Sequence, residues 1–260
     1  MFQTMLLDIP HIFISKLKVL YKIIIDRFFL SYKKKKAKIF FKKKDYLKYF
    51  FEGLTNEFMP NFIDLERLFK LIIKRKPKVI LEFGSGFSTI AICLALREIQ
   101  AKENFIGKLI SVEGNKNWFD NTKNKINDDL KPFVKIKYSA SNSILIDNQL
   151  ASLHESLPNV SPNFIYLDGP SPLDVESKIN GLSFKMDDPR ELNKNCERRI
   201  VSADALLYES TAPSDFFILV DRRYNNVNFL EKNLKYDYKI KKNLHFGGFT
   251  TFEKKYQPYP

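Results

Sequence analysis

The sequence predicts an α/β fold in which a mostly parallel sheet is covered by helices on both faces. Two observations favour it. From residue 60 onward, short apolar runs of strand length alternate with longer segments that have helical periodicity. Two further strand-like runs, 236–243 and 247–255, then follow each other across a short turn, which predicts an antiparallel hairpin. Alternating strands and helices form parallel sheets that bind ligands at the carboxyl ends of their strands.

Five strands are expected before the hairpin, so the whole sheet has seven. They are the runs 78–83, 108–113, 133–138, 163–168 and 215–221. Helices are expected at 61–76, 88–100, 115–130, 198–210 and 225–234, with one more in the loose region after residue 138. Residues 171–197 are polar and are expected to form a long, partly irregular insertion. The expected architecture is therefore a Rossmann-like, doubly wound sheet.

Length and composition indicate one large domain and an added segment. The chain has 260 residues, and 44% of them are hydrophobic, which is enough to bury a core. We expect a basic amphipathic segment at 1–58 and the α/β domain at 59–260. Two cysteines far apart and three histidines disfavour a zinc site and a disulfide framework, and no metal is expected. This cysteine usage fits a reducing, cytoplasmic setting.

The formal net charge of +13 is concentrated near the N-terminus. Residues 16–48 hold 13 of the 43 Lys and Arg residues but only two acids, Asp26 and Asp45. The other 30 basic residues are nearly balanced by 28 acids. Proteins that grip duplex nucleic acid usually carry a basic face on the folded domain. Nucleic acid is therefore disfavoured as a partner.

The basic arm has the pattern of an amphipathic helix. It holds no run of about 18 uncharged residues, so it is not expected to span a membrane. Phe13, Leu17 and Leu20 fall on one side at helical spacing, while Lys18 and Lys22 fall on another. Such a helix can lie on an anionic membrane surface, here at the inner face. The alternative is a helix that docks on the main domain beside a solvated lysine run.

The stretch "VILEFGSGFSTI" at 79–90 predicts a ligand-binding turn between a strand and a helix. Gly84 and Gly86 allow a positive φ or a close approach to a ligand. Ser88 or Thr89 can cap the following helix, whose free N–H groups favour negative charge. Glu82, two residues before the turn, would repel a pyrophosphate and suits a ligand with a cationic amine or sulfonium.

A second acid, Glu113, ends the second strand, where a carboxylate can accept hydrogen bonds from both ribose hydroxyls. With "LEFGSGFST", "SVEGNKNWF", "FIYLDGP", "ILVDRR" and the terminal hairpin, residues 60–255 resemble the class I S-adenosylmethionine-dependent methyltransferases. The resemblance implies that the Glu82–Ser88 loop binds the methionine part and that Glu113 binds the ribose. Residues 139–142 would lie near the adenine, and Asp168 near the transferred methyl. The implied cofactor-binding residues are Glu82, Gly84, Ser85, Gly86, Ser88, Thr89, Glu113, Gly114, Asn115 and Asp168.

The expected reaction is O-methylation of a small molecule or a saccharide, and a hydroxyl acceptor needs a base. Asp168 is the first candidate and His245, in the hairpin turn, the second. Asp168 and Asp221 end neighbouring strands and could share a divalent ion, but Arg222 beside them argues against it. Arg222 and Arg223 suit an anionic acceptor, such as a nucleotide- or lipid-linked sugar, although salt bridges are the commoner role of such arginines.

Other functions remain open on the sequence. The same scaffold resembles aminopropyl transferases, but their glycine-rich acidic loop is not seen. Nicotinamide binding is disfavoured because Thr89 stands where a third glycine would complete G-x-G-x-x-G. A non-catalytic nucleotide-binding protein recruited to a membrane is the main alternative to an enzyme. Methylation of nucleic acid is disfavoured because the sequence contains no Asn/Asp-Pro-Pro-aromatic tetrad.

Overall fold

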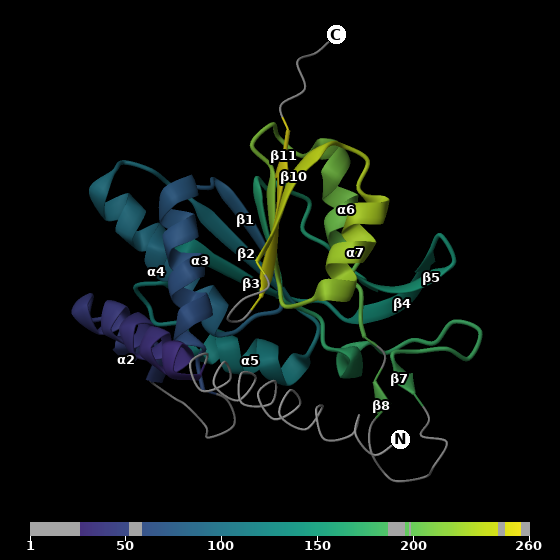
Figure 1. Cartoon of the computed structure of the whole chain (residues 1–260), viewed down its shortest axis with the longest axis horizontal. Coiled ribbons are helices and arrows are strands. Elements are labelled where there is room, and N and C mark those ends of the chain that lie inside the picture. Colours follow the sequence, from purple (N-terminus) through teal and green to yellow (C-terminus); the bar gives the residue numbers. More distant parts are fainter. Residues whose placement is uncertain (1–26, 52–58, 187–195, 198, 244–247, 256–260) are drawn as a thin grey trace, which may run out of the picture.

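A computed structural model describes residues 27–51, 59–186, 196–197, 199–243 and 248–255 (Figure 1). The predicted base His245 and residues 1–26 of the basic arm lie outside these ranges.

A seven-stranded sheet forms the centre of the molecule, in the order β10-β11-β9-β6-β1-β2-β3. Five strands are parallel, and each corresponds to a predicted run: β1 (Val79–Phe83), β2 (Lys108–Glu113), β3 (Val134–Tyr138), β6 (Phe164–Leu167) and β9 (Phe217–Asp221). The predicted hairpin is β10 (Tyr238–Asn243) and β11 (Phe249–Lys254), and β11 pairs antiparallel with β9. The chain has the Rossmann-like fold that its sequence predicts.

Helices cover both faces of the sheet (Figure 1). Strand residues alternate between the two faces, so Ile80 packs in the core under α3 (Phe62–Arg75) and α4 (Phe87–Lys102). Its neighbour Leu81 packs in the opposite core, with α6 (Asp204–Tyr208) and α7 (Tyr224–Asn233). The same alternation places Glu82 on the α4 face. The remaining helix of the parallel half, α5 (Lys116–Lys125), follows β2.

The described part of the basic arm docks on the domain. Residues 27–43 are helical, and α2 (Leu47–Phe51) follows. Phe41 is fully buried and packs edge-on against Phe69 of α3, with ring centroids 5.9 Å apart. Phe50 is 1% exposed and packs on Phe41. The alternative that this segment docks therefore holds for residues 37–50, which share one core with α3 and α4.

The helix expected after residue 138 is wrong. The region instead forms an antiparallel hairpin of β4 (Ser141–Ile146) and β5 (Gln149–His154). Its two turn residues, Asp147 and Asn148, both have a left-handed backbone, with φ of 47° and 59°. Asp and Asn tolerate this conformation, which matches the twist of a tight hairpin.

Two other expectations about helices are corrected. The helix at 198–210 is confined to α6, because the backbone at Val201 and Ala203 hydrogen-bonds to Ser152 of β5 and not within a helix. The helix at 115–130 ends at Lys125, five residues early. Within the insertion, the described residues form a 3₁₀ turn at Pro172–Asp174 and the two-residue strands β7 (Lys185–Met186) and β8 (Cys196–Glu197). Two further 3₁₀ turns in the described ranges are Lys131–Phe133 and Glu209–Thr211.

Candidate functional site

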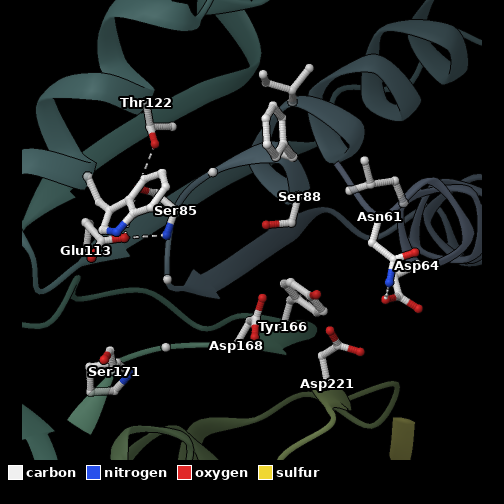
Figure 2. Close-up of a pocket in the computed structure, with 18 of the residues that line it drawn as sticks. Asn61, Asp64, Ser85, Ser88, Glu113, Thr122, Tyr166, Asp168, Ser171 and Asp221 are labelled. Atoms are coloured by element: carbon white, nitrogen blue, oxygen red, sulfur yellow. Dashed lines mark hydrogen bonds between the residues drawn. The ribbon is translucent and has the colours of Figure 1, made fainter. Parts of the chain in front are cut away.

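A cleft of about 440 Å³ opens at the carboxyl ends of β1, β2, β6 and β9 (Figure 2). Its walls come from the β1–α4 loop, the end of β2, helix α5, the segment after β6, the end of β9 and the start of α3. Among the residues that the structure describes, five acids and three basic residues line it: Asp64, Glu113, Asp168, Asp174 and Asp221, with Lys125, Arg222 and Arg223. The cleft lies where a parallel sheet is expected to bind its ligand.

The backbone amides of the glycine loop are used within the protein. The Gly84 amide donates to the carbonyl of Val112 at 2.9 Å. The Ser85 amide donates to Glu113 Oε2 at 2.6 Å, and the Gly86 amide donates to Thr89 Oγ1 at 3.0 Å. A loop that binds phosphate presents such N–H groups to the ligand. This loop presents none of these three, so its geometry does not suit a pyrophosphate.

Glu82 stabilises the glycine loop from inside the protein core. Its side chain is fully buried and is absent from the residues that line the cleft. Oε2 accepts a hydrogen bond at 2.6 Å from the Thr89 hydroxyl, which itself accepts from the Gly86 amide. Burial raises the pKa of Glu82 to about 7, and the surrounding hydroxyls oppose that rise. Glu82 and Thr89 therefore fix the shape of the turn.

Glu113 joins the ends of β1 and β2 (Figure 2). Besides the Ser85 amide, its Oε2 accepts from the Ser85 hydroxyl at 3.0 Å, and its Oε1 accepts from the Asn115 amide at 2.8 Å. Burial raises its pKa, whereas the hydrogen bonds from Asn115 and Ser85 lower it. An ionised carboxylate has about four acceptor positions, so one on Oε1 remains for a ligand hydroxyl in the cleft.

The opposite wall holds a second group of acids. Asp168 follows β6 and Asp221 ends β9, and both carboxylates face the cleft beside the Tyr166 ring (Figure 2). Desolvation of the carboxylate by the surrounding protein, together with repulsion from Asp221, raises the pKa of Asp168 to about 7. Its side chain nevertheless keeps 47% of its surface exposed, so a ligand can reach it. The pKa of Asp221 is also raised, and burial is the main cause.

The two arginines after β9 already have protein partners. Arg223 donates to the carbonyl of Pro170 at 2.8 Å and to the carbonyl of Asp168, and its Nε lies 3.8 Å from Asp168 Oδ1. Arg222 pairs with Asp64 of α3, which also pairs with Arg67. These contacts agree with the reading of the arginines as salt-bridge partners. Arg223 thereby holds the segment that carries Asp168.

The structure brings six of the ten predicted cofactor-binding residues to the cleft surface: Gly84, Ser85, Gly86, Ser88, Glu113 and Asp168. The other four do not line it: Glu82, Thr89, Gly114 and Asn115. Asn115 instead caps α5 by accepting from the Trp118 amide at 3.0 Å. Sequence reasoning missed Asp64, Thr122 and Tyr166, because only the folded chain brings these residues from α3, α5 and β6 to one cleft.

Within the ranges that the structure describes, no group of three or more His, Cys, Asp or Glu side chains is placed to hold a metal ion. Asp168 and Asp221 form a pair only. No described helix is long and apolar enough to cross a membrane.

No family model matches the chain, and no curated protein matches it. Solved structures resemble it in fold. The O-methyltransferase TomG from Streptomyces achromogenes, in complex with S-adenosylmethionine, is 12% identical over 89% of this chain and 96% of its own, with a TM-score of 0.46. An O-methyltransferase from Bacillus cereus bound to S-adenosylhomocysteine is 12% identical over 89% and 97%, with a TM-score of 0.45. The methyltransferase PaMTH1 from Podospora anserina, also bound to S-adenosylhomocysteine, is 14% identical over 76% and 80%, with a TM-score of 0.45. At identities of 12–14% and TM-scores below 0.5, these structures do not determine the function of this chain.

Proposed function

We propose that this protein is an S-adenosylmethionine-dependent methyltransferase that acts on a hydroxyl group of a small molecule. The proposal depends on the glycine loop. Its three amides, at residues 84–86, donate hydrogen bonds to groups of the protein, and the Glu113 carboxylate lines the cleft beside them. A nucleotide with a pyrophosphate needs free amides there. A nucleoside with a cationic side chain needs a ribose acceptor and acidic walls, and the cleft supplies both.

The charges in the cleft support the same ligand. Five acids face three basic residues, and two of the three, Arg222 and Arg223, are already bound to protein groups. A ligand that carries a sulfonium and an ammonium group is stabilised by such walls, whereas a phosphate is repelled. When bound, S-adenosylmethionine supplies an activated methyl group.

The residues of this chain then align the acceptor and take its proton. Alignment of the reacting groups supplies much of the rate in such a transfer. Asp168 lies on the wall opposite Glu113, is open to the cleft and has a pKa raised to about 7, which suits a base at neutral pH. Arg223 holds the backbone of Asp168 and so fixes the direction of its carboxylate. His245 stays a predicted second base.

The acceptor half of the cleft lies between α3 and the ends of β6 and β9. Met59, Leu65 and Tyr166 give it apolar surface, and Asp64 and Asp221 give it negative charge. Because Arg222 is paired with Asp64, this half does not favour the anionic, nucleotide- or lipid-linked acceptor that the arginine pair suggests. A neutral hydroxyl compound, a simple sugar among them, fits it better.

The proposal is tested by a transfer assay with radiolabelled S-adenosylmethionine and a panel of neutral and anionic hydroxyl compounds. We expect methylation of a neutral member, and loss of that activity in Asp168→Asn with the protein still folded. Binding of the cofactor without transfer to any member would favour the non-catalytic alternative.

A second candidate role concerns the basic arm, and we propose that its described helix contacts an anionic membrane surface. Residues 27–43 have two apolar faces. Ala37 and Phe41 face the core, while Phe28, Tyr32 and Ile39 fall on the opposite side at helical spacing and are 70%, 58% and 40% exposed. Exposed lysines flank this outer stripe: Lys35, Lys36, Lys42 and Lys43. Aromatic residues beside lysines suit the headgroup region of an anionic bilayer.

Vesicle binding tests this contact. Removal of residues 1–50 is unsuitable because it would strip Phe41 and Phe50 from the core. The triple variant Phe28→Ser, Tyr32→Ser, Ile39→Ser leaves the docked face intact and should lose binding to phosphatidylserine vesicles. Lys35→Glu with Lys36→Glu should also lose it, whereas Lys239→Glu with Lys241→Glu, an equal charge change on exposed β10 lysines, should not. Equal vesicle binding by all variants would contradict the contact.

A further inference from the structure

A second cavity lies on the α3 side of the sheet, near the amino ends of its parallel strands. Its volume is about 640 Å³, a size typical of sites for small molecules. Pro77, Asn163 and Asp215, which precede β1, β6 and β9, line one end of it. The last turns of α3 and the β10–β11 hairpin form its sides. None of its described lining residues also lines the cleft, so it is a separate cavity.

The topology of the sheet leaves this cavity open to a ligand. Thr251 of β11 pairs with Lys241 of β10, and Glu253 pairs with Lys239. Directly paired residues point to the same face, and the neighbouring Phe252 packs in the opposite core, so these four side chains lie on the α3 side. Lys239 and Lys241 are exposed, so no described helix covers this face of β10 (Figure 1). A groove therefore remains between α3 and the hairpin.

The floor of the cavity is aromatic. Phe217 is 3% exposed and Phe164 is fully buried, and their ring centroids lie 5.3 Å apart. The Arg75 guanidinium lies over the Phe217 ring, 3.6 Å from its centroid. Partly buried Leu71 and Phe249 extend the apolar surface along α3 and β11. This surface suits the flat, apolar body of a ligand, since most small-molecule sites are lined in this way.

The rim of the cavity is basic. Among the described residues, four basic residues and two acids line the cavity: Lys74, Arg75, Lys241 and Lys242, with Asp215 and Glu253. Both acids already have a donor. Arg75 Nη2 lies 2.7 Å from Glu253 Oε1, and the Asn163 side chain donates to Asp215 at 2.8 Å. The hydrogen bond from Arg75 is the main cause of the lowered pKa of Glu253, and two β10 lysines lower it further.

Two of the four basic residues keep an uncompensated charge. Lys242 pairs with Glu231, with Nζ and Oε1 2.7 Å apart. Lys74, in the last turn of α3, and Lys241 of β10 take part in no ion pair within the described ranges. These two ammonium groups stand on opposite sides of the groove and attract an anion. The acids nearby would repel a second negative charge, so a monoanion fits better than a phosphate.

We propose that this cavity is a second ligand site, which binds a small carboxylic acid with a flat apolar body. Lys74 and Lys241 hold the carboxylate, and the apolar body lies on the floor formed around Phe217. The hydroxyl of Thr251, a residue that lines the cavity and is 8% exposed, can donate a further hydrogen bond. The site lies apart from the cleft, so the proposal does not depend on the proposed function.

Calorimetry on the full chain with naphthalene-2-carboxylate and the uncharged naphthalene-2-carboxamide tests the proposal. At low ionic strength the wild type should prefer the carboxylate by about fivefold, and added salt should reduce this preference. In Lys74→Gln with Lys241→Gln the preference should fall to within roughly twofold. The control Lys123→Gln with Lys135→Gln removes the same charge from the last turn of α5 and from the opposite edge strand β3. It should keep the full preference.

Leu71→Asn tests the apolar floor. It should weaken the binding of both naphthalene compounds by at least about threefold and keep the preference for the carboxylate, because it removes apolar contact and no charge. Saturating S-adenosylhomocysteine should leave the affinity for the carboxylate unchanged, since the two cavities share no described residue. Competition between the two ligands would place the carboxylate in the cleft and overturn the proposal. No binding to the wild type, equal affinity for both compounds, or a full preference in the folded Lys74→Gln, Lys241→Gln variant would also overturn it.

Discussion

Gly84 and Gly169 pack backbone against backbone at the junction of the two loops that follow β1 and β6. A methyl group on Gly84 would lie 2.8 Å from the Gly169 nitrogen, and one on Gly169 would lie 2.7 Å from the Gly84 Cα atom. The sequence marks Gly84 as part of a turn, but only the folded chain reveals its partner. This contact sets the distance between the glycine loop and Asp168.

We therefore predict that Gly169→Ala disturbs both stability and ligand binding. The added methyl should destabilise the fold by about 1–3 kcal/mol, as overpacking does, and lower the affinity for S-adenosylhomocysteine. Urea denaturation and calorimetry measure the two effects. In Gly181→Ala nothing lies within 4 Å of the new methyl, so only a strain cost of about 1–2 kcal/mol from its left-handed backbone should appear. Unchanged affinity in Gly169→Ala would show that the contact does not shape the site.

Thr89→Val should destabilise the turn without enlarging the side chain. The variant leaves the Gly86 amide and the buried Glu82 carboxylate without their common partner, a loss of about 1–3 kcal/mol in the free energy of unfolding. Thr89→Ser keeps the hydroxyl and should recover most of the loss. Thr211→Val, at an exposed threonine, should stay within about 0.5 kcal/mol of wild type. Equal effects at the two sites would contradict the supporting role of Thr89.

Asp168→Asn should lower kcat by roughly 10²–10⁴ and change the affinity for S-adenosylhomocysteine little, because the base acts on the acceptor. The pKa of Asp168 is raised to about 7, and only the ionised carboxylate accepts a proton. Wild-type activity should therefore rise as the pH increases through about 7. Steady-state rates measured between pH 5 and 9 would check this. The range also covers the ordinary pKa of a histidine, so a histidine base would be detected as well. A flat profile would exclude Asp168 as the base.

Arg223→Gln should move that pH profile upward. The Arg223 guanidinium lowers the pKa of Asp168, and its removal leaves burial and Asp221 repulsion less opposed. Arg222→Gln is a matched control, because Arg222 lowers the same pKa less and its side chain pairs with Asp64. Its profile should shift less. A downward shift in Arg223→Gln would contradict the electrostatic account of the site.

Much of the fold could be predicted because it depends on local patterns. The apolar runs around Ile80 and Ile218 predict strands. The two runs around Tyr238 and Phe252 have no helical segment between them, which predicts a hairpin. The β4–β5 hairpin was missed although Asp147 and Asn148 form a recognisable turn. The helix that contains α6 was predicted to start too early, because its start depends on the tertiary bridge between Ser152 and Ser202.

The site was predicted in part for the same reason. Strand-end acids such as Glu113 and Asp168 can be located from strand boundaries alone. The separate roles of Glu82 and Ser85 could not, because alternation within β1 and the turn after it decide which side chain is buried and which faces the cleft. Pairings such as His154 with Asp204, 50 residues apart, leave no signal in a single sequence.

Calorimetric titration of the purified protein with S-adenosylmethionine and S-adenosylhomocysteine tests the central claim most directly. We predict micromolar binding of both, loss of binding in Glu113→Ala, and nearly normal binding in Ser85→Ala, which removes a hydroxyl contact to Glu113 but keeps the carboxylate and the loop amide. We also predict no binding of NAD or ATP, because the three loop amides already donate hydrogen bonds within the protein and cannot bind their phosphates. Tight binding of NAD or ATP, or a folded protein that binds no adenosine compound, would contradict the account.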